Sequence, residues 1–151
     1  MAFAFQYARI LKLREDDEQF KKSELAKSQQ RRVLAQEALQ KLINEKTDFD
    51  QERASRLSDG VKASDLVWFR DSEQWFIETI ELSKGQLRQA ELEVINARVA
   101  LVKATQERKK FEKLKELALN RFIEVEAVRE ANMIDGIVTY QSAKNKKGAE
   151  S

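Results

Sequence analysis

Apolar residues recur at alternating steps of four and three positions from Phe76 to Arg129. Twelve of the 16 positions on this path are apolar, and the stretch contains no proline. A mean spacing of 3.5 residues is typical of a coiled-coil seam, whereas a helix on the surface of a globular domain has a wider apolar face. At 1.5 Å per residue this helix is at least ~80 Å long, which exceeds the diameter of a compact domain of this size. The sequence therefore predicts a long helix that pairs with another helix along its length.

The same step, started at Leu11 and followed to Arg56, defines a weaker seam near the beginning of the chain. Only six of its 14 positions are apolar, and four of these lie between Ala35 and Phe49. We therefore expect the first helix to be a poor coiled-coil partner in its first half and a good one from Ala35 to Phe49. Residues 1–13 are rich in apolar side chains, and we interpret them as the start of this helix with about two or three frayed residues.

The turn signal between the two helices is Ser58-Asp59-Gly60. Gly60 suits the left-handed position just past a helix end, and Ser64 suits the N-cap of the next helix. A connection of about seven residues makes two long helices antiparallel neighbours. We therefore predict an all-α fold, a long antiparallel two-helix coiled-coil hairpin. It would form a single domain over residues 1–143 with its bend near 58–64, followed by a polar, disordered tail at 144–151.

A fold-back at this bend predicts which residues face each other across the seam. Residue i then lies opposite roughly residue 123 − i. This places Phe49 near Phe76, Leu42 near Ile80 and Phe5 near Ala118. The second helix is longer than the first, so we expect its residues beyond about 122 to form an overhang.

Two rows of apolar residues lie away from the predicted seam. The row beside the bend comprises Trp68, Trp75 and Leu82, and the second row comprises Leu92, Ile95, Val99 and Val102. In a lone hairpin both rows would face water, and contiguous exposed apolar surface usually marks a contact. A short flanking helix or a second copy of the chain would cover them, or they would dock another protein, with the tryptophans as anchors.

The composition removes most catalytic chemistry. The chain has no cysteine and no histidine, which excludes the usual zinc sites, cysteine nucleophiles and histidine acid–base catalysis. Its four glycines are too scattered to form a phosphate-binding loop, and a two-helix rod offers no dry pocket. We therefore predict that the chain is not an enzyme and has no catalytic residues, no cofactor and no metal site.

The charges are balanced over the whole chain. The net charge is +2, from 28 basic and 26 acidic residues that are interleaved, which argues against nucleic-acid binding. The most basic run, from Lys103 to Lys115, fits a solvated helix face or a contact with an acidic protein partner. No apolar run approaches ~18 residues, so we predict no direct membrane insertion. The absence of cysteine permits a reducing cytoplasm.

Several segments resemble FliJ, a small cytoplasmic protein of the flagellar type III export apparatus. They are the opening Met-Ala-Phe-x-Phe followed by Leu11–Glu15, then Ala38–Ile43, Asp59-Gly60, Gln74–Glu81 and Arg108–Leu114. Their order and spacing are FliJ-like over nearly the whole chain. The resemblance implies a non-enzymatic coiled-coil stalk, similar to the central shaft of rotary ATPases, located in the cytoplasm at the inner-membrane export gate. A related stalk of virulence secretion systems stays open as an alternative.

The same resemblance implies the partners. FliJ-like proteins insert their paired termini into the hexameric ring of the export ATPase FliI and promote its assembly. They also contact the cytoplasmic domain of the export gate protein FlhA, and export chaperones are further partners.

The resemblance also implies two sets of site residues. The gate-binding patch would comprise Leu42, Phe49, Phe76, Ile80, Ser83 and Leu87. Because its four residues on the second helix lie on the seam, they could pack, bind or do both. The end that faces the ATPase ring would comprise Phe3, Phe5, Tyr7 and Ile10 with Phe122, Val125 and Met133. A ring lumen would cover the apolar side chains of this overhang.

Two other functions are compatible with the same pattern. One is a self-associating structural or tethering coiled coil, and the other is a general holdase chaperone; neither has an ATPase partner. We expect a stalk to be monomeric in isolation, whereas a scaffold would be a stable dimer or larger.

Overall fold

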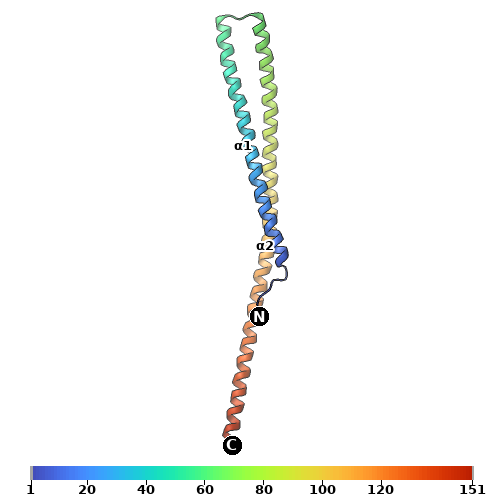
Figure 1. Cartoon of the computed structure of the whole chain (residues 1–151), viewed down its shortest axis with the longest axis vertical. Coiled ribbons are helices and arrows are strands. Elements are labelled where there is room, and N and C mark those ends of the chain that lie inside the picture. Colours follow the sequence, from blue (N-terminus) through green and yellow to red (C-terminus); the bar gives the residue numbers. More distant parts are fainter. Residues whose placement is uncertain (1, 151) are drawn as a thin grey trace. The chain divides into compact units, whose positions relative to one another are not determined.

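The computed structural model describes residues 2–150 and contains two long helices (Figure 1). Helix α1 extends over Ala8–Asp59 and helix α2 over Ala63–Glu150, and residues 60–62 connect them. No strand occurs in the described range. The two helices pack against each other, which confirms the predicted all-α helical hairpin.

The chain divides into two compact units. The bend unit is Asp17–Ala104 and contains most of α1, the connection and the first part of α2. The terminal unit combines the described residues up to Asp16 with those from Thr105 onward. Each unit is described by itself below, and the single domain over residues 1–143 stays a prediction.

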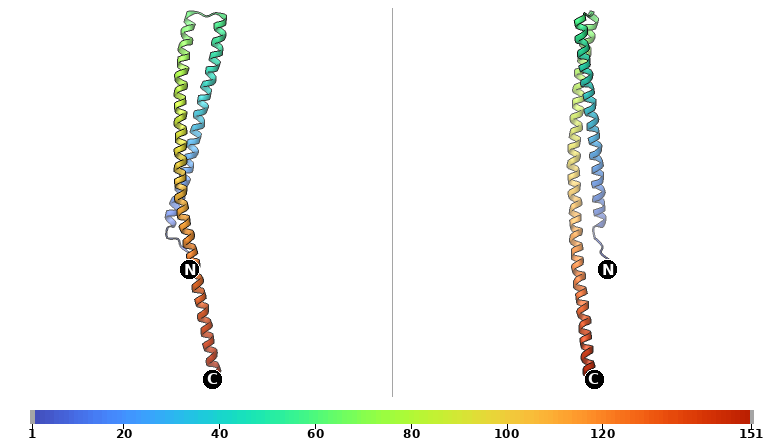
Figure 2. Two further views of the ribbon diagram at one scale, coloured as in Figure 1. Left: turned by 180° about the vertical axis from the view of Figure 1, so that it is seen from behind. Right: turned by 90° about the vertical axis from the view of Figure 1, so that its left-hand side faces the viewer.

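In the bend unit, α1 and α2 lie side by side and antiparallel (Figure 2). The Phe49 and Phe76 ring centroids are 5.3 Å apart, and Arg53 forms an ion pair with Glu73 at 2.7 Å. The buried residues of α2 in this unit are Phe69, Ser83, Ala90, Val94 and Ala104. From Ser83 onward these are all positions of the predicted seam.

The register of this pairing is close to the predicted one. A second ion pair between the helices joins Arg31 to Glu93 at 3.4 Å. In this pair and in the pairs Phe49–Phe76 and Arg53–Glu73, the residue numbers of the two facing residues sum to between 124 and 126. This lies within three residues of the predicted 123.

Polar residues occupy seam positions in the first half of α1 without breaking the pairing. Ser28 is only 2% exposed, and its hydroxyl donates a hydrogen bond to the carbonyl of Leu25 at 2.8 Å. Glu18 is buried and forms an ion pair with Lys22 at 3.3 Å. A small side chain that is satisfied by its own helix can be buried at low cost. This explains how α1 keeps a seam with so few large apolar residues.

The bend combines one confirmed prediction with one correction. Gly60 has φ = +94°, the left-handed conformation expected just past a helix end. The N-cap of α2, however, is Lys62 and not Ser64. The backbone N–H of Lys62 donates to the Asp65 carboxylate at 3.2 Å, and the N–H groups of Asp65 and Leu66 donate to the Lys62 carbonyl. An acidic residue in the first turn, bonded back to the N-cap, stabilises the helix start.

In the terminal unit, the chain before Ala8 is not helical, so the predicted helix start is wrong. The Phe3 ring lies 5.5 Å from Phe122, and the Tyr7 ring lies 6.3 Å from Phe111. Their partners Phe111 and Phe122 are separated by roughly 16 Å along α2. In a helix, the four-residue step from Phe3 to Tyr7 would rise only ~6 Å. Residues 2–5 are irregular and Gln6 and Tyr7 form a turn, with the N–H of Ala8 donating to the carbonyl of Phe5 at 3.3 Å. This non-helical backbone lets both aromatic side chains contact α2.

The predicted disordered tail is helical in this structure. Helix α2 continues through Glu150, and the described side chains of this segment are exposed; residue 151 lies outside the described range. The segment has no proline and contains alanine, lysine and glutamate, which favour a helix without tertiary contacts. Neither α1 nor α2 has a stretch long and apolar enough to cross a membrane within the described residues.

We expect two glycine substitutions in the bend unit to change stability in opposite directions. Gly60→Ala should lower the free energy of unfolding by about 1–2 kcal/mol, because the left-handed conformation is strained for alanine. Gly85→Ala should raise it by about 0.5–1 kcal/mol, because the new methyl group meets only the end of the Arg88 side chain, at 3.7 Å. Urea unfolding followed at 222 nm measures both. Equal effects of the two variants would contradict this account of the bend.

Candidate interaction surfaces

The gate-binding patch implied by the resemblance lies on the seam of the bend unit. Phe49 and Ser83 are buried, at 7% and 5% exposure. The other four members are half-buried: Leu42, Phe76, Ile80 and Leu87. The structure brings Phe49 and Phe76 into ring contact, as the register predicts. These six residues therefore hold the two helices together, and a partner can reach only the exposed edges of the half-buried four.

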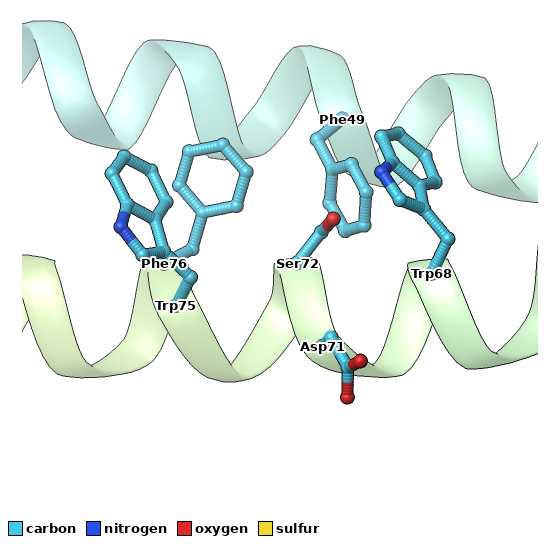
Figure 3. Close-up of a pocket in the computed structure, with 6 residues that line it drawn as sticks. All are labelled: Phe49, Trp68, Asp71, Ser72, Trp75 and Phe76. Atoms are coloured by element: carbon cyan, nitrogen blue, oxygen red, sulfur yellow. The ribbon is translucent and has the colours of Figure 1, made fainter.

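Beside this patch, aromatic side chains from both helices line a groove that we call the aromatic groove (Figure 3). Its volume is about 580 Å³, and its lining residues are Phe49 from α1 and Trp68, Asp71, Ser72, Trp75 and Phe76 from α2. Trp68 and Trp75 remain 51% and 53% exposed. About half of each indole therefore packs against neighbouring side chains, and the other half is open to a partner.

Ring contacts hold the aromatic groove in place. The Phe49 ring lies 5.9 Å from Trp68, and the Trp75 ring lies 5.0 Å from Phe76. Phe69, at 3% exposure, packs 6.1 Å from Phe49 and 5.3 Å from Trp68. Sequence reasoning missed Phe69 as the buried anchor of this cluster. It precedes Phe76 by seven residues, so extending the seam by one heptad toward the bend would have found it.

The other predicted apolar positions of the bend unit are exposed, as their places in the heptad require. Leu82 is 64% exposed, and the four residues of the second row are 50–54% exposed. Ile95 of this row borders a shallow groove with Val33 of α1. No part of the bend unit covers either row.

In the terminal unit, residues 2–7, which we call the N-terminal segment, pack on α2. Phe3, Phe5 and Phe122 are half-buried, whereas Tyr7 and Ile10 are 39% and 37% exposed. The segment and α2 line an open cavity of about 680 Å³. Its lining includes Phe3, Phe5, Tyr7, Ala118, Phe122 and Val125. Phe5 and Ala118, predicted to face each other, line this same cavity.

Beyond this cavity α2 forms the predicted overhang. All described side chains from residue 127 onward are exposed. The large apolar ones among them are Val128, Met133, Ile134, Ile137, Val138 and Tyr140, at 52–68% exposure. Met133 therefore lies in the overhang rather than against the N-terminal segment.

The candidate sites are grooves and exposed apolar rows on the two units. No group of three or more histidine, cysteine, aspartate or glutamate residues that could hold a metal occurs within residues 2–150. The grooves described above are lined mainly by aromatic and aliphatic side chains. Such surfaces bind other macromolecules through burial of apolar area.

The comparisons with known proteins agree with the sequence resemblance. A family model described as "Flagellar FliJ protein" matches residues 3–147. Comparisons with curated proteins and with solved structures gave no match. The matched range includes nearly all of both units.

We expect the two aromatic positions at the bend to differ sharply when truncated. Trp75→Ala should leave the ellipticity at 222 nm and the unfolding midpoint near those of the parent chain, because the indole is half exposed. Phe69→Ala should lower the free energy of unfolding by about 3–5 kcal/mol, because it leaves a cavity between the helices. Thermal unfolding followed by circular dichroism measures both. An equal loss for Trp75→Ala would show that this ring belongs to the core.

Proposed function

This chain belongs to the FliJ family, and from that premise we propose that it is the stalk of the flagellar export ATPase. Membership makes the chain a component of the flagellar protein export apparatus. In the proposal, the terminal unit inserts into the hexameric ATPase ring and promotes its assembly. The bend unit contacts the cytoplasmic domain of the export gate, so that the stalk links the ring to the gate. The chain itself is non-enzymatic and works in the cytoplasm, peripheral to the inner membrane.

The observation that carries the proposal is the apolar overhang of α2. Six large apolar side chains between residues 128 and 140 are more than half exposed. Full burial of such a side chain gives about 1.5–3 kcal/mol, so this segment gains free energy when a partner surrounds it. The lumen of a ring surrounds a single helix on all sides, whereas a flat partner covers one face.

The N-terminal segment supports the same role. It adds Phe3, Phe5 and Tyr7 to the surface of α2 without adding a second helix. The exposed edges of these rings and Ile10 would contact the wall of the ring, with Phe122 and Val125 beside them. The segment therefore widens the apolar surface at this end of α1.

Contact with the gate would use the half-buried members of the patch on the bend unit. Leu42, Phe76, Ile80 and Leu87 keep part of their surface open, whereas Phe49 and Ser83 are buried and position them. Export chaperones would be further partners on the exposed apolar rows. Those rows also favour a second candidate function, a self-associating scaffold, which light scattering separates: a stalk is monomeric in isolation and a scaffold is at least a dimer.

We expect deletion of residues 2–7 to abolish stimulation of the purified export ATPase while sparing binding to the gate domain. The deletion removes the aromatic side chains that contact α2 in the terminal unit but none in the bend unit. ATP hydrolysis and gate-domain pull-down provide the two readouts. Gln30→Ala, an exposed change on α1, is the matched control and should behave as the parent chain does. Unchanged stimulation by the deletion would argue against ring insertion through this end.

A further inference from the structure

The charges that balance over the whole chain do not balance at the bend. Residues 45–82 hold ten acidic and five basic side chains, a net charge of −5. Since the whole chain carries +2, the remaining residues carry +7. The segment around the aromatic groove is therefore acidic within an otherwise basic chain. A surface of one sign attracts a partner of the opposite sign and repels its own kind.

The exposed apolar side chains of this segment are spaced for a helical partner. Trp68, Trp75 and Leu82 follow one another at seven-residue intervals on α2 and are 51–64% exposed. Seven residues correspond to about 10.5 Å along a helix, which is the repeat of a coiled-coil seam. A third helix with apolar residues at the same interval would pack along this row as helices pack in a bundle.

The acidic groups beside the groove are open to a new partner. Asp71, which lines the groove, pairs with its neighbour Arg70 at 3.4 Å, and both side chains are at least two-thirds exposed. Such an exposed ion pair contributes little to the stability of the fold, so either side chain can pair with a charged group of a partner instead. Asp71 is a lining residue of the groove, and Figure 3 shows its carboxylate pointing away from Phe49 on the far side of α2. A cation bound there would not have to enter the apolar interior.

The cluster already accommodates one guanidinium group. Arg53 of α1 lies 5.7 Å from the Phe49 ring centroid, and its charge is compensated by Glu73 at 2.7 Å and Asp50 at 3.5 Å. The exposed indoles of Trp68 and Trp75 offer further ring faces, and tryptophan is the best partner for a cation. The aromatic groove thus combines apolar area, ring faces and nearby carboxylates.

We propose that the aromatic groove binds a basic amphipathic helix of a partner protein. Apolar residues at positions i and i+7 of that helix contact Trp68 and Trp75, and its lysine or arginine side chains face the carboxylates of the bend. A symmetric pairing of two bends would place −5 against −5, which disfavours a second copy as the occupant. The groove shares Phe49 and Phe76 with the proposed gate-binding patch. The inference itself rests on charge and spacing in residues 45–82 and does not depend on insertion into the ATPase ring.

Two synthetic peptides test the proposal. One is an 18-residue helix with leucine at heptad spacing and lysine at the exposed positions, and the other replaces each lysine by glutamate. The chain has two tryptophans, and both line the groove, so its tryptophan emission reports occupancy directly. We expect the lysine peptide to change this emission on titration and the glutamate peptide to leave it unchanged. Binding should weaken as salt rises, because surface charges are screened.

Variants locate the binding site. With a dye on the lysine peptide and anisotropy as readout, Trp75→Ala should weaken binding about tenfold or more, as expected for an anchor residue. Asp71 lines the groove, and Glu78 is an exposed carboxylate seven residues further along α2. The double variant Asp71→Asn with Glu78→Gln should weaken binding about threefold and reduce the salt dependence. Val99→Ala, equally exposed but in the other apolar row, is the matched control and should bind as the parent chain does.

Three results would overturn the proposal. Equal affinity for the lysine and glutamate peptides would show that charge does not select the partner. Unchanged affinity of the Trp75→Ala variant for the lysine peptide would show that the peptide binds outside the aromatic groove. A dimer of the chain that dissociates on Trp75→Ala substitution would show that a second copy occupies the groove. Circular dichroism of each variant confirms that the helices are intact. None of these results bears on stimulation of the ATPase, so this proposal and the stalk function fail separately.

Discussion

The pairing of α1 with α2 along a 3.5-residue seam is the constraint on which the rest of the structure depends. A two-helix coiled coil has one narrow apolar interface, so it buries few side chains and exposes every other apolar residue it carries. Small residues such as Ser28, Ser83 and Ala90 occupy buried seam positions in the bend unit. The tryptophans at the bend and the row around Ile95 are exposed because the seam has no room for them. The interaction surfaces are therefore a direct consequence of the fold.

Much of this arrangement could be predicted from the sequence, because a repeat that extends over many heptads averages out local exceptions. The helix pair, the exposed rows and the approximate register follow from spacing, and the left-handed Gly60 follows from the turn signal. The N-cap at Lys62 could not be predicted in this way, because it depends on the side chain of Asp65 folding back onto the backbone. The non-helical segment before Ala8 was also missed, since contacts with Phe111 and Phe122 outweigh local helix preference.

The candidate sites were predictable to different degrees. Heptad position alone identified Trp68, Trp75 and the second row as exposed, but it could not show that Phe49 and Phe76 form one wall of a groove. Phe69 was missed because the apolar repeat was followed only from Phe76 onward. The two units also differ in chemistry. The bend unit combines aromatic rings with an excess of carboxylates, whereas the terminal unit presents an apolar overhang, so each is suited to a different kind of partner.

The most direct test of the account is chemical cross-linking of the two helices within one chain. The chain has no cysteine, so a short bismaleimide reacts only at introduced thiols. Arg31→Cys with Glu93→Cys replaces a pair of side chains that are in contact at 3.4 Å and should give an intramolecular cross-link at low protein concentration. Arg31→Cys with Thr79→Cys places the second thiol about 21 Å further along α2 and should give none. Cross-linked dimers with the first pair, or efficient internal cross-linking with the second, would contradict the antiparallel seam.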